Sequence, residues 1–233
     1  MHWKADQLQQ LLDQTHPDQA FGNALELVQH LDLNFLGLVV YLNVPGQPRR
    51  IISYNNYPDA WNAHYEANGF IKVDPIPLQS RQSTNAVLWR DELFEKVPEF
   101  RKTACSYGLR HGWTQSVHDQ RHNELQLSVA RPVGDISTEE LYENSAQALW
   151  LCHSLHGILC EHHQPSSGPD PALTDREHEV LKWSAAGKTA ADIACILSLS
   201  TSTVNFHIRS LITKTNASNK AGAIAIAAMK GLL

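Results

Sequence analysis

The stretch that decides the fold of the second half of the chain runs from Thr189 to Ile212 and reads TAADIACILSLSTSTVNFHIRSLI. Thr189 precedes a short segment of helical periodicity that ends near Leu197, and Ser200 precedes a longer one. Ser and Thr are favoured directly before a helix because their hydroxyl accepts one of the unpaired backbone N–H groups. Two helices joined by the tight turn 198–200 are typical of a helix-turn-helix, whose second helix enters the major groove of DNA.

The second of these helices carries polar side chains on the face away from its apolar stripe. Asn205 and Arg209 are four residues apart, so they share one face. Arg can bridge guanine and Asn can bridge adenine in the major groove. The residues suited to phosphate contacts are Thr201, Thr203, Ser210, Lys214 and Lys220. Periodicity alone also allows an ordinary helical bundle with solvated polar side chains.

The flanking segments predict a four-helix domain over residues 173–233. Thr174 and Glu177 have the spacing of a capping box, which begins a first helix, and Gly187 ends it. An alanine-rich fourth helix covers residues 220–232. Upstream, residues 164–172 contain three prolines, one glycine and two serines, so we expect a linker there. Residues 1–163 then form the first domain.

Composition and charge narrow the class of protein. The chain is 42% hydrophobic and 18% charged, which excludes a disordered protein. Residues 173–233 carry seven Lys and Arg against four Asp and Glu, whereas the whole chain carries 19 against 24. A basic module behind an acidic one suggests a sensor joined to an anion-binding effector. We find no run of 18 apolar residues and no apolar signal-peptide core after Met1, so we expect a cytoplasmic protein without membrane contact.

The first domain mixes helices and strands. The strands mostly follow one another as antiparallel neighbours, with helices between them, which predicts an α+β fold: an α/β/α sandwich on a mainly antiparallel sheet. A phospho-receiver domain would need an acidic pocket and a strict strand–helix alternation, and neither is present. We expect helices over residues 5–14, 18–31, 58–67, 91–107 and 138–163, another starting at Asp74-Pro75, and strands over 36–42, 50–54, 113–118 and 124–131.

An aromatic cluster is the main candidate site of this domain. Tyr57, Trp61 and Tyr65 recur at intervals of four, so they lie on one helix face. Trp89 and Trp113 follow later in the chain, with Asp74 between. An apolar chamber with few polar groups is how small-molecule pockets are built. The alternatives are an ordinary core stripe and, for the Asp before Pro75, a simple helix cap.

Specific residues of both halves resemble a known family. The C-terminal run includes Leu173-Thr174, Arg176-Glu177, Gly187-Lys188-Thr189, Thr203-Val204, Phe206-His207-Ile208 and Asn219-Lys220. It resembles the DNA-binding domain of LuxR-type transcription factors. The N-terminal set includes Asn56-Tyr57-Pro58, Trp61, Tyr65, Asp74-Pro75-Ile76, Trp89, Gly108-Leu109, Gly112, Thr114 and Leu127-Ser128. It resembles the autoinducer-binding domain of quorum-sensing LuxR-type receptors, which bind N-acyl-homoserine lactones.

The resemblance implies a ligand-responsive transcriptional regulator that binds dyad-symmetric promoter DNA as a homodimer. In the family, the positions of Asn205 and Arg209 face bases. The expected partners are double-stranded DNA, the small-molecule autoinducer and RNA polymerase. We expect no catalytic activity, no metal and no cofactor apart from the lactone. A LuxR-type regulator that answers a non-lactone molecule, or no ligand, is the alternative.

The resemblance also assigns roles in the ligand site. Trp61 would donate its indole N–H to the lactone carbonyl, and Asp74 would accept the ligand amide N–H. The acyl carbonyl would accept hydrogen bonds from Tyr57 and Ser128. Tyr65 and Trp89 would enclose the lactone, and Thr114 belongs to the same matched set.

Two further residues bear on the choice of ligand. Gln126 falls on the same strand face as Ser128, where a long polar side chain could shorten the acyl tunnel or bind an oxygen on the acyl chain. Trp113 is bulky and lies next to the expected pocket hairpin, so either residue could set the chain length. Both are included in the predicted ligand site.

Two competing hypotheses concern metal binding and catalysis. Cys152, His156 and Cys160 share a helix face, with His153, His162 and His163 nearby, and such a set could bind Zn²⁺ or Cu⁺. The other interpretation is a packing or dimerisation helix in which Cys acts as a small apolar residue. No G-x-S-x-G, P-loop or G-x-G-x-x-G motif is present, which argues against the common enzyme classes.

Overall fold

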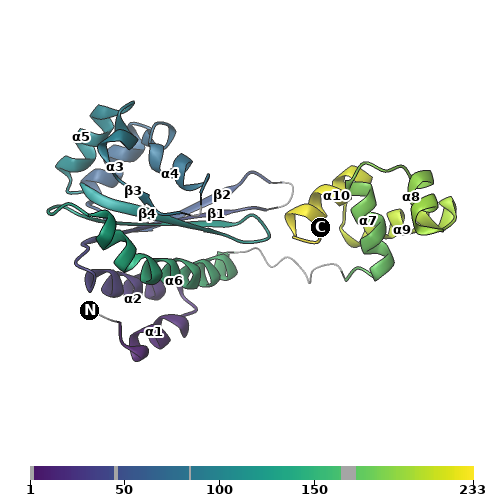
Figure 1. Cartoon of the computed structure of the whole chain (residues 1–233), viewed down its shortest axis with the longest axis horizontal. Helices are drawn as coiled ribbons and strands as arrows, with labels where there is room; N and C mark the ends of the chain where they lie inside the picture. The colour runs from purple at the N-terminus through teal and green to yellow at the C-terminus, as the bar shows by residue number, and fades with distance from the viewer. Residues whose placement is uncertain (1–2, 45–46, 84, 164–171) are drawn as a thin grey trace. The chain divides into compact units, whose positions relative to one another are not determined.

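The computed structural model describes residues 3–44, 47–83, 85–163 and 172–233, and it divides into two compact units (Figure 1). The first unit is the mixed α+β part, and the second consists of the C-terminal helices, so the predicted fold class is confirmed. The predicted linker lies outside the described residues except for Ala172. In the described part of the chain, no helix is both long and apolar enough to span a membrane.

A five-stranded sheet forms the centre of the first unit. Its order is β2-β1-β5-β4-β3, and the pairs β1–β5, β5–β4 and β4–β3 are antiparallel. The neighbouring strands β4 and β5 pair as an antiparallel hairpin, as the sequence predicts. The strands are β1 (Phe35–Leu42), β2 (Arg50–Asn55), β3 (Val87–Leu88), β4 (His111–His118) and β5 (Glu124–Arg131).

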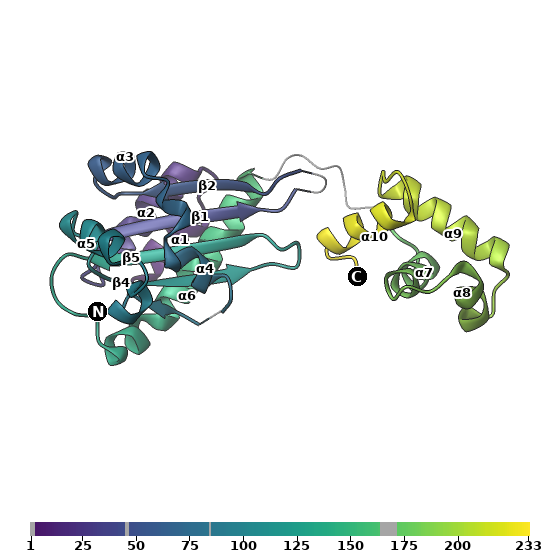
Figure 2. The same ribbon diagram turned by 90° about the horizontal axis from the view of Figure 1, so that it is seen from above.

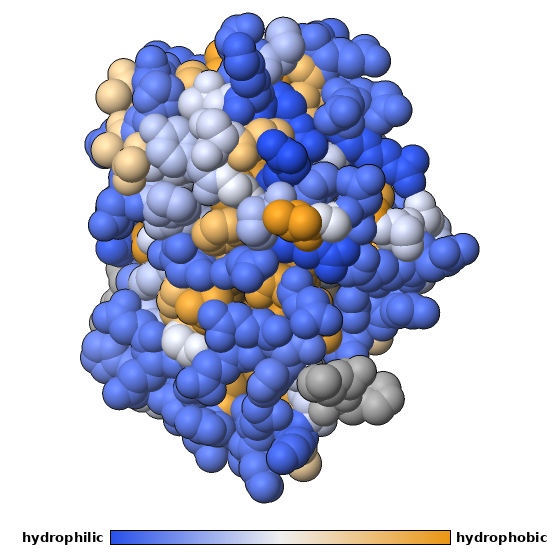
Figure 3. Space-filling view, turned by 90° about the vertical axis from the view of Figure 1, so that its left-hand side faces the viewer, coloured by the Kyte–Doolittle hydropathy of each residue, from blue (hydrophilic) through white to orange (hydrophobic). Residues whose placement is uncertain are grey.

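Helices cover both faces of this sheet (Figures 1 and 2). One face carries α1 (Ala5–Leu12), α2 (Pro17–Gln29) and the long α6 (Thr138–His163). The other face carries α3 (Asp59–Ala67), α4 (Pro75–Ser80) and α5 (Pro98–Ser106), with the short 3₁₀ helices η1 (Phe70–Lys72) and η2 (Asp91–Phe94). The surface seen in Figure 3 is mostly hydrophilic, with a few hydrophobic side chains showing between the elements.

The strand pleat separates two cores. Leu125, Leu127 and Val129 pack with α2 and α6 in a large aliphatic core. Ala130 instead joins a smaller, aromatic core beneath α3 and α5. Because successive side chains of a strand point to opposite faces, the even-numbered residues of β5 and β4 face α3 and α4.

Two local elements differ from the sequence prediction. The helix expected over residues 91–107 is divided, because Pro98 lacks the backbone N–H that a continuous helix needs and instead sits at the start of α5. Strand β3 was not predicted, since two residues carry no periodicity. Both differences lie near Trp89 and leave the sandwich architecture unchanged.

The second unit contains four helices: α7 (Asp175–Ala185), α8 (Ala190–Leu197), α9 (Thr201–Lys214) and α10 (Lys220–Met229). Thr174, Thr189 and Ser200 cap the first three through side-chain hydrogen bonds, as predicted. Ser198 adopts φ +54° between α8 and α9 and makes the tight turn of the helix-turn-helix. A core that includes Val180, Ile193, Val204, Leu211 and Ala227 joins the four helices.

Candidate functional site

The predicted aromatic stripe lies in the smaller core of the first unit. Trp61 is 4% exposed, and its ring centroid lies 5.6 Å from that of Tyr65 and 5.9 Å from that of Phe100. Tyr57 precedes α3 and packs on Phe35 at 6.1 Å. The stripe is therefore part of a core, and its function depends on the polar groups that enter that core.

A chain of hydrogen bonds runs across the sheet beneath these rings. The indole N–H of Trp89 donates to Thr114 Oγ1 at 3.0 Å, and Thr114 Oγ1 lies 2.8 Å from Ser128 Oγ. Burial raises the pKa of Tyr57 above its ordinary value, the charge of Asp74 adds to the shift, and a hydrogen bond with Ser128 opposes it. Four of the predicted site residues thus form one connected network.

Asp74 lies directly before α4 and connects that helix to α3. Its Oδ1 accepts the backbone N–H of Ile76 at 2.9 Å and so caps α4, while its Oδ2 accepts the hydroxyl of Tyr65 at 3.1 Å. Burial raises the pKa of Asp74 to about 6, although both hydrogen bonds favour the charged form. Each oxygen keeps acceptor capacity, because a carboxylate offers about four lone-pair sites.

Some hydrogen-bonding groups of this core have no partner within the described residues or can accept a further bond, so a ligand could use them. Among the described residues, no hydrogen bond occupies the indole N–H of Trp61, whereas that of Trp89 is used by Thr114. The core therefore offers one indole donor, one carboxylate acceptor and several hydroxyls. This set complements a small molecule that carries carbonyl oxygens and at least one N–H or O–H donor.

Two glycines allow the rings to lie close to the sheet. A Cβ at Gly37 would collide with the hydroxyl of Tyr57. A Cβ at Gly112 would meet the Val129 carbonyl and would approach Trp89 to 2.8 Å. The positions of both rings therefore depend on the absence of side chains on β1 and β4.

The structure corrects the assignment of Trp113 to the site. Its side chain is fully buried in the aliphatic core with α2 and α6, on the other face of the sheet. Thr114 and Gln126 lie on the opposite face, which carries the candidate ligand site, since both have even numbers in the paired strands β4 and β5. Trp113 therefore cannot touch a molecule held between Trp61 and Asp74.

A separate groove of about 400 Å³ opens near the start of α6. Its charged side chains largely pair with one another: Arg101 with Asp91 at 3.3 Å, and His111 with Asp135 at 2.9 Å. Burial lowers the pKa of His111. The groove lacks the hydroxyl network and the Trp61 donor, so we place the candidate site in the aromatic core.

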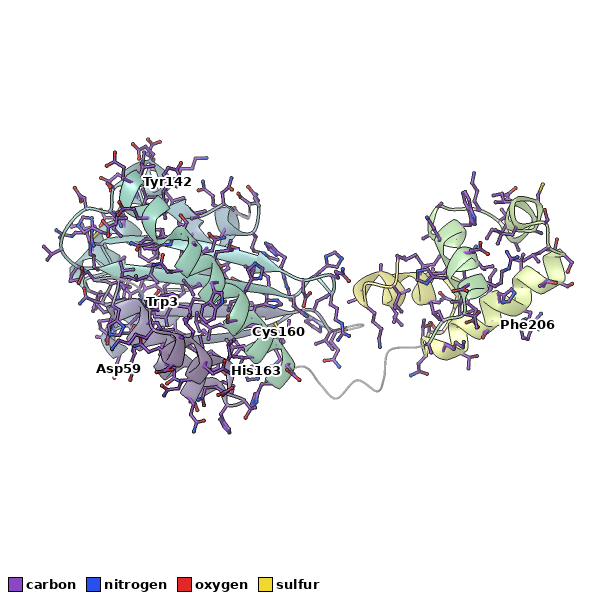
Figure 4. All side chains as sticks on the ribbon, turned by 60° about the horizontal axis from the view of Figure 1, so that its bottom comes forward. Trp3, Asp59, Tyr142, Cys160, His163 and Phe206 are labelled. Atoms are coloured by element: carbon purple, nitrogen blue, oxygen red, sulfur yellow. The ribbon has the colours of Figure 1, made fainter. Side chains whose placement is uncertain are left out.

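Helix α9 presents the predicted DNA-reading face. Asn205 and Arg209 are exposed, and so is Thr201. Phe206 is 67% exposed and projects from α9 in Figure 4, although an apolar ring normally avoids water. The sequence analysis gives Phe206 no role, and its ring is suited to contact a thymine methyl group. Thr203 is partly buried, and its hydroxyl lies 2.8 Å from that of the cap Ser200.

Two residues that are predicted to contact phosphate, Lys214 and Ser210, also hydrogen-bond to Glu177 within the second unit. Lys214 Nζ donates to Glu177 Oε2 at 2.7 Å and to the Ala172 carbonyl at 2.8 Å, and Ser210 Oγ donates to Glu177 Oε1 at 2.6 Å. Burial alone would raise the pKa of Glu177, but hydrogen bonds from Lys214, Ser210 and Thr174 lower it to about 2. Lys220 Nζ donates one hydrogen bond to the Lys188 carbonyl at 3.0 Å and has two more N–H groups, so its phosphate contact stays a prediction.

The cysteines of α6 pack as core residues. Cys152 is fully buried, and its thiol lies 3.6 Å from the Gln115 carbonyl. Burial raises the pKa of Cys152, which disfavours the thiolate that a metal would need. Cys160 is 4% exposed and belongs to the same aliphatic core, near the end of α6 in Figure 4. For Cys152, this arrangement favours the packing interpretation.

Comparison with known proteins decides the family. Residues 17–158 match the model of the autoinducer binding domain, and residues 171–227 match that of bacterial regulatory proteins, luxR family. The chain belongs to the LuxR family of quorum-sensing transcriptional regulators. This LuxR-type chain is therefore a transcriptional regulator and not an enzyme.

Relatives cover nearly the whole LuxR-type chain. Regulatory protein SdiA of Escherichia coli is 33% identical over 88% of this chain and 86% of its own length. The HTH-type quorum-sensing regulator RhlR of Pseudomonas aeruginosa is 32% identical over 98% and 95%. A crystal structure of Escherichia coli SdiA aligns with a TM-score of 0.73 at 29% identity, over 98% and 97%. SdiA in complex with octanoyl-rac-glycerol aligns with a TM-score of 0.69 at 29% identity, over the same shares.

Proposed function

We propose that the chain binds an N-acyl-homoserine lactone in the aromatic core of its first unit and regulates transcription through α9. The observation that carries the proposal is that this core offers a ligand both an acceptor and a donor. The acceptor is the carboxylate of Asp74 at the edge of the core, and the donor is the indole N–H of Trp61, which no hydrogen bond within the described residues occupies. An acyl-homoserine lactone has one N–H and two carbonyls. A site that leaves any of these groups buried and unpaired would lose about 1–3 kcal/mol for each.

The proposed contacts use each polar group once. Trp61 donates to the lactone carbonyl, and Asp74 accepts the amide N–H. Tyr57 and Ser128 are linked by a hydrogen bond that uses one of their two O–H groups, and the other O–H donates to the acyl carbonyl. Tyr65 keeps the carboxylate of Asp74 in place, and Trp89 is fixed against the sheet by Thr114.

An acylglycerol is the second candidate ligand. The observation that favours it is the SdiA complex with octanoyl-rac-glycerol, in a relative whose structure covers 98% of this chain. A monoacylglycerol has hydroxyl donors in place of the amide N–H, so Asp74 could accept from a hydroxyl. The two candidates share an acyl chain and a carbonyl, and differ in the head group.

Mass spectrometry of the ligand retained by the protein tests the proposal. The full chain is produced with equal concentrations of hexanoyl-homoserine lactone and hexanoyl glycerol, purified, and extracted. We expect the lactone to be retained at one equivalent per chain. Retention of the glycerol ester alone would make the second candidate the ligand, and retention of neither would overturn the proposed ligand class.

We further propose that the regulator acts as a homodimer on dyad-symmetric promoter DNA in the bacterial cytoplasm. One recognition helix reads only a few base pairs, so two act together on half-sites. Between Glu139 and Glu161 of α6, five exposed residues at intervals of three and four include no Lys, Arg, Asp or Glu, which suits contact with a second copy. They are Tyr142, Ala146, Leu149, His153 and Gly157.

A further inference from the structure

The ligand face of the sheet becomes more polar toward one end. Strand pairing places Ser128 opposite Thr114, Gln126 opposite Ser116, and Glu124 opposite His118. Ala130 lies one row beyond Ser128, among the aromatic rings. Suppose that the head group of a molecule lies by Trp61 and that its carbonyl reaches Ser128. The rest of that molecule would next meet Gln126 and Ser116, which pair across β5 and β4.

Helix α4 is fastened to the sheet at this row. Gln126 Nε2 donates to the Pro77 carbonyl at 3.0 Å, and Ser116 Oγ donates to the Ser80 carbonyl at 2.9 Å. Both carbonyls belong to α4, and that of Pro77 also accepts the backbone N–H of Arg81 at 3.3 Å. Gln126 therefore reaches from the floor of the candidate site, β5, to the helix above it.

The side chain of Gln126 has no N–H left for a ligand. Its second donor goes to Glu124 Oε1 at 2.6 Å, and an amide nitrogen carries only two. Glu124 is 1% exposed and forms an ion pair with Arg81 Nε at 3.2 Å. The guanidinium of Arg81 lies 5.0 Å from the centre of the Tyr41 ring. Of the two roles that the sequence allowed for Gln126, this arrangement supports a barrier and disfavours a donor to an oxygen on the acyl chain.

We infer that Gln126, held between Pro77 and Glu124, closes the far end of the acyl subsite and restricts the ligand to short acyl chains. The inference rests on the proposed function. Ser128 and Gln126 are two residues apart on one strand, about 7 Å, which an extended chain of about five carbon atoms spans. Acyl chains of four to six carbons fit before the barrier, and longer chains must break the Gln126 hydrogen bonds.

The test compares the full-length wild type with two variants of Gln126. Dissociation constants are measured for homoserine lactones with butanoyl, hexanoyl, octanoyl and dodecanoyl chains. We expect the wild type to prefer butanoyl or hexanoyl. Gln126→Ala opens the barrier and should improve octanoyl or dodecanoyl binding by about tenfold or more relative to hexanoyl, as expected when a methylene-sized space is gained in an apolar pocket. Gln126→Met keeps the length of the side chain but loses the hydrogen bonds that hold it, so its preference for short chains should be weaker than that of the wild type and stronger than that of Gln126→Ala.

The outcomes separate this inference from the proposed function. A wild type that binds dodecanoyl lactone most tightly, or a Gln126→Ala variant with an unchanged order of chain lengths, would overturn the barrier while lactone binding stands. A wild type that binds no lactone would overturn both. Ser116→Ala is the matched control: it removes the neighbouring bond to α4 and leaves Gln126 in place, so the order of chain lengths should stay as in the wild type. If Gln126→Ala does not fold, the wild-type and Gln126→Met series still decide the preference.

Discussion

Asp74 is the residue in which structure and proposed function coincide. As the cap of α4 it stabilises the fold, and as a partly buried carboxylate it offers an acceptor to the ligand. The sequence left the cap and the ligand contact as alternatives. The two oxygens, each with one hydrogen bond and spare lone pairs, allow both roles at once.

The raised pKa of Asp74 predicts a pH dependence of ligand binding. Its pKa is about 6 in the folded protein, against an ordinary value of 3.8. Between these two pH values the folded chain keeps a proton that the unfolded chain has lost. The free energy of unfolding without ligand should therefore fall as the pH rises from about 4 to about 6. An amide N–H favours the ionised form, so lactone affinity should be constant above about pH 7 and fall by up to about tenfold per unit below about pH 6. Calorimetric titrations from pH 5 to 8 measure this. Affinity that rises on acidification would contradict the contact.

Arg209 and Lys220 should differ when each is replaced by Ala. Arg209 is proposed to contact a base edge, so its loss should cost about 1–3 kcal/mol on the specific site and relax the sequence preference. Lys220 is proposed to contact phosphate, so its loss should weaken binding to all sequences alike and reduce the slope of log affinity against log salt by about one. Binding curves on specific and random DNA at several salt concentrations separate the two. An equal loss on both DNAs for Arg209→Ala would show that it reads no base.

At the scale of elements, local rules predicted much of the secondary structure. The capping residues Thr174, Thr189 and Ser200 mark their helices in sequence because a cap acts over three residues. Trp113 and Thr114 are adjacent on β4, so only one of them can face the ligand side. Counting strand parity from Ser128 through the β4–β5 pairing would have placed Trp113 in the aliphatic core.

Contacts between distant residues could not be read from the sequence. The hydrogen bond of Lys214 to Glu177 joins residues 37 positions apart. The Gln126 bond to Pro77 joins residues 49 positions apart. Neither pairing leaves a local periodic signal, since it depends on how α7 packs on α9 and how α4 lies over the sheet.

The Glu177 network predicts the stability of the second unit. Glu177→Gln removes the charge that holds Lys214 and Ser210, so we expect α7 and α9 to lose about 2–3 kcal/mol of protection in hydrogen exchange of the full chain. Glu179→Gln is the matched control, because Glu179 forms an exposed pair with Arg176 and should cost no more than about 0.5 kcal/mol. Equal effects would show that the buried network contributes nothing special. Since the pKa of Glu177 is lowered to about 2, its contribution should be complete above about pH 5 and lost as the pH falls toward 2.

At the scale of the whole molecule, the proposed binding to dyad-symmetric DNA requires two copies of the chain. The exposed stripe on α6 includes Tyr142, 73% exposed and labelled in Figure 4, and Leu149, 41% exposed. We expect the double variant Tyr142→Asp with Leu149→Asp to shift the chain toward monomer in sedimentation equilibrium and to weaken binding to dyad-symmetric DNA. Glu143→Ala, an exposed neighbour on α6, should leave the dimer intact. A wild type that is monomeric on a single half-site would overturn the dimer.

A ligand in the aromatic core would become part of the interior of the first unit, so binding and folding are coupled. Ligand that binds only the folded chain stabilises it by about 2.7 kcal/mol at a hundredfold excess over Kd. For a chain of this size, that corresponds to a rise in Tm of about 5–10 °C. The same coupling would let a change in ligand concentration alter the amount of folded regulator available to bind DNA.

The most direct test of ligand binding in the aromatic core is the rise in Tm with acyl-homoserine lactones in the wild type, in Asp74→Asn and in Asp59→Asn. Asp59 is an exposed residue of α3 and serves as the control (Figure 4). We predict a rise of about 5–10 °C in the wild type and in Asp59→Asn, and less than about half of it in Asp74→Asn, which keeps the size but loses the charge of the acceptor. No rise with any acyl chain length in the wild type, or an equal rise in Asp74→Asn, would contradict the claim.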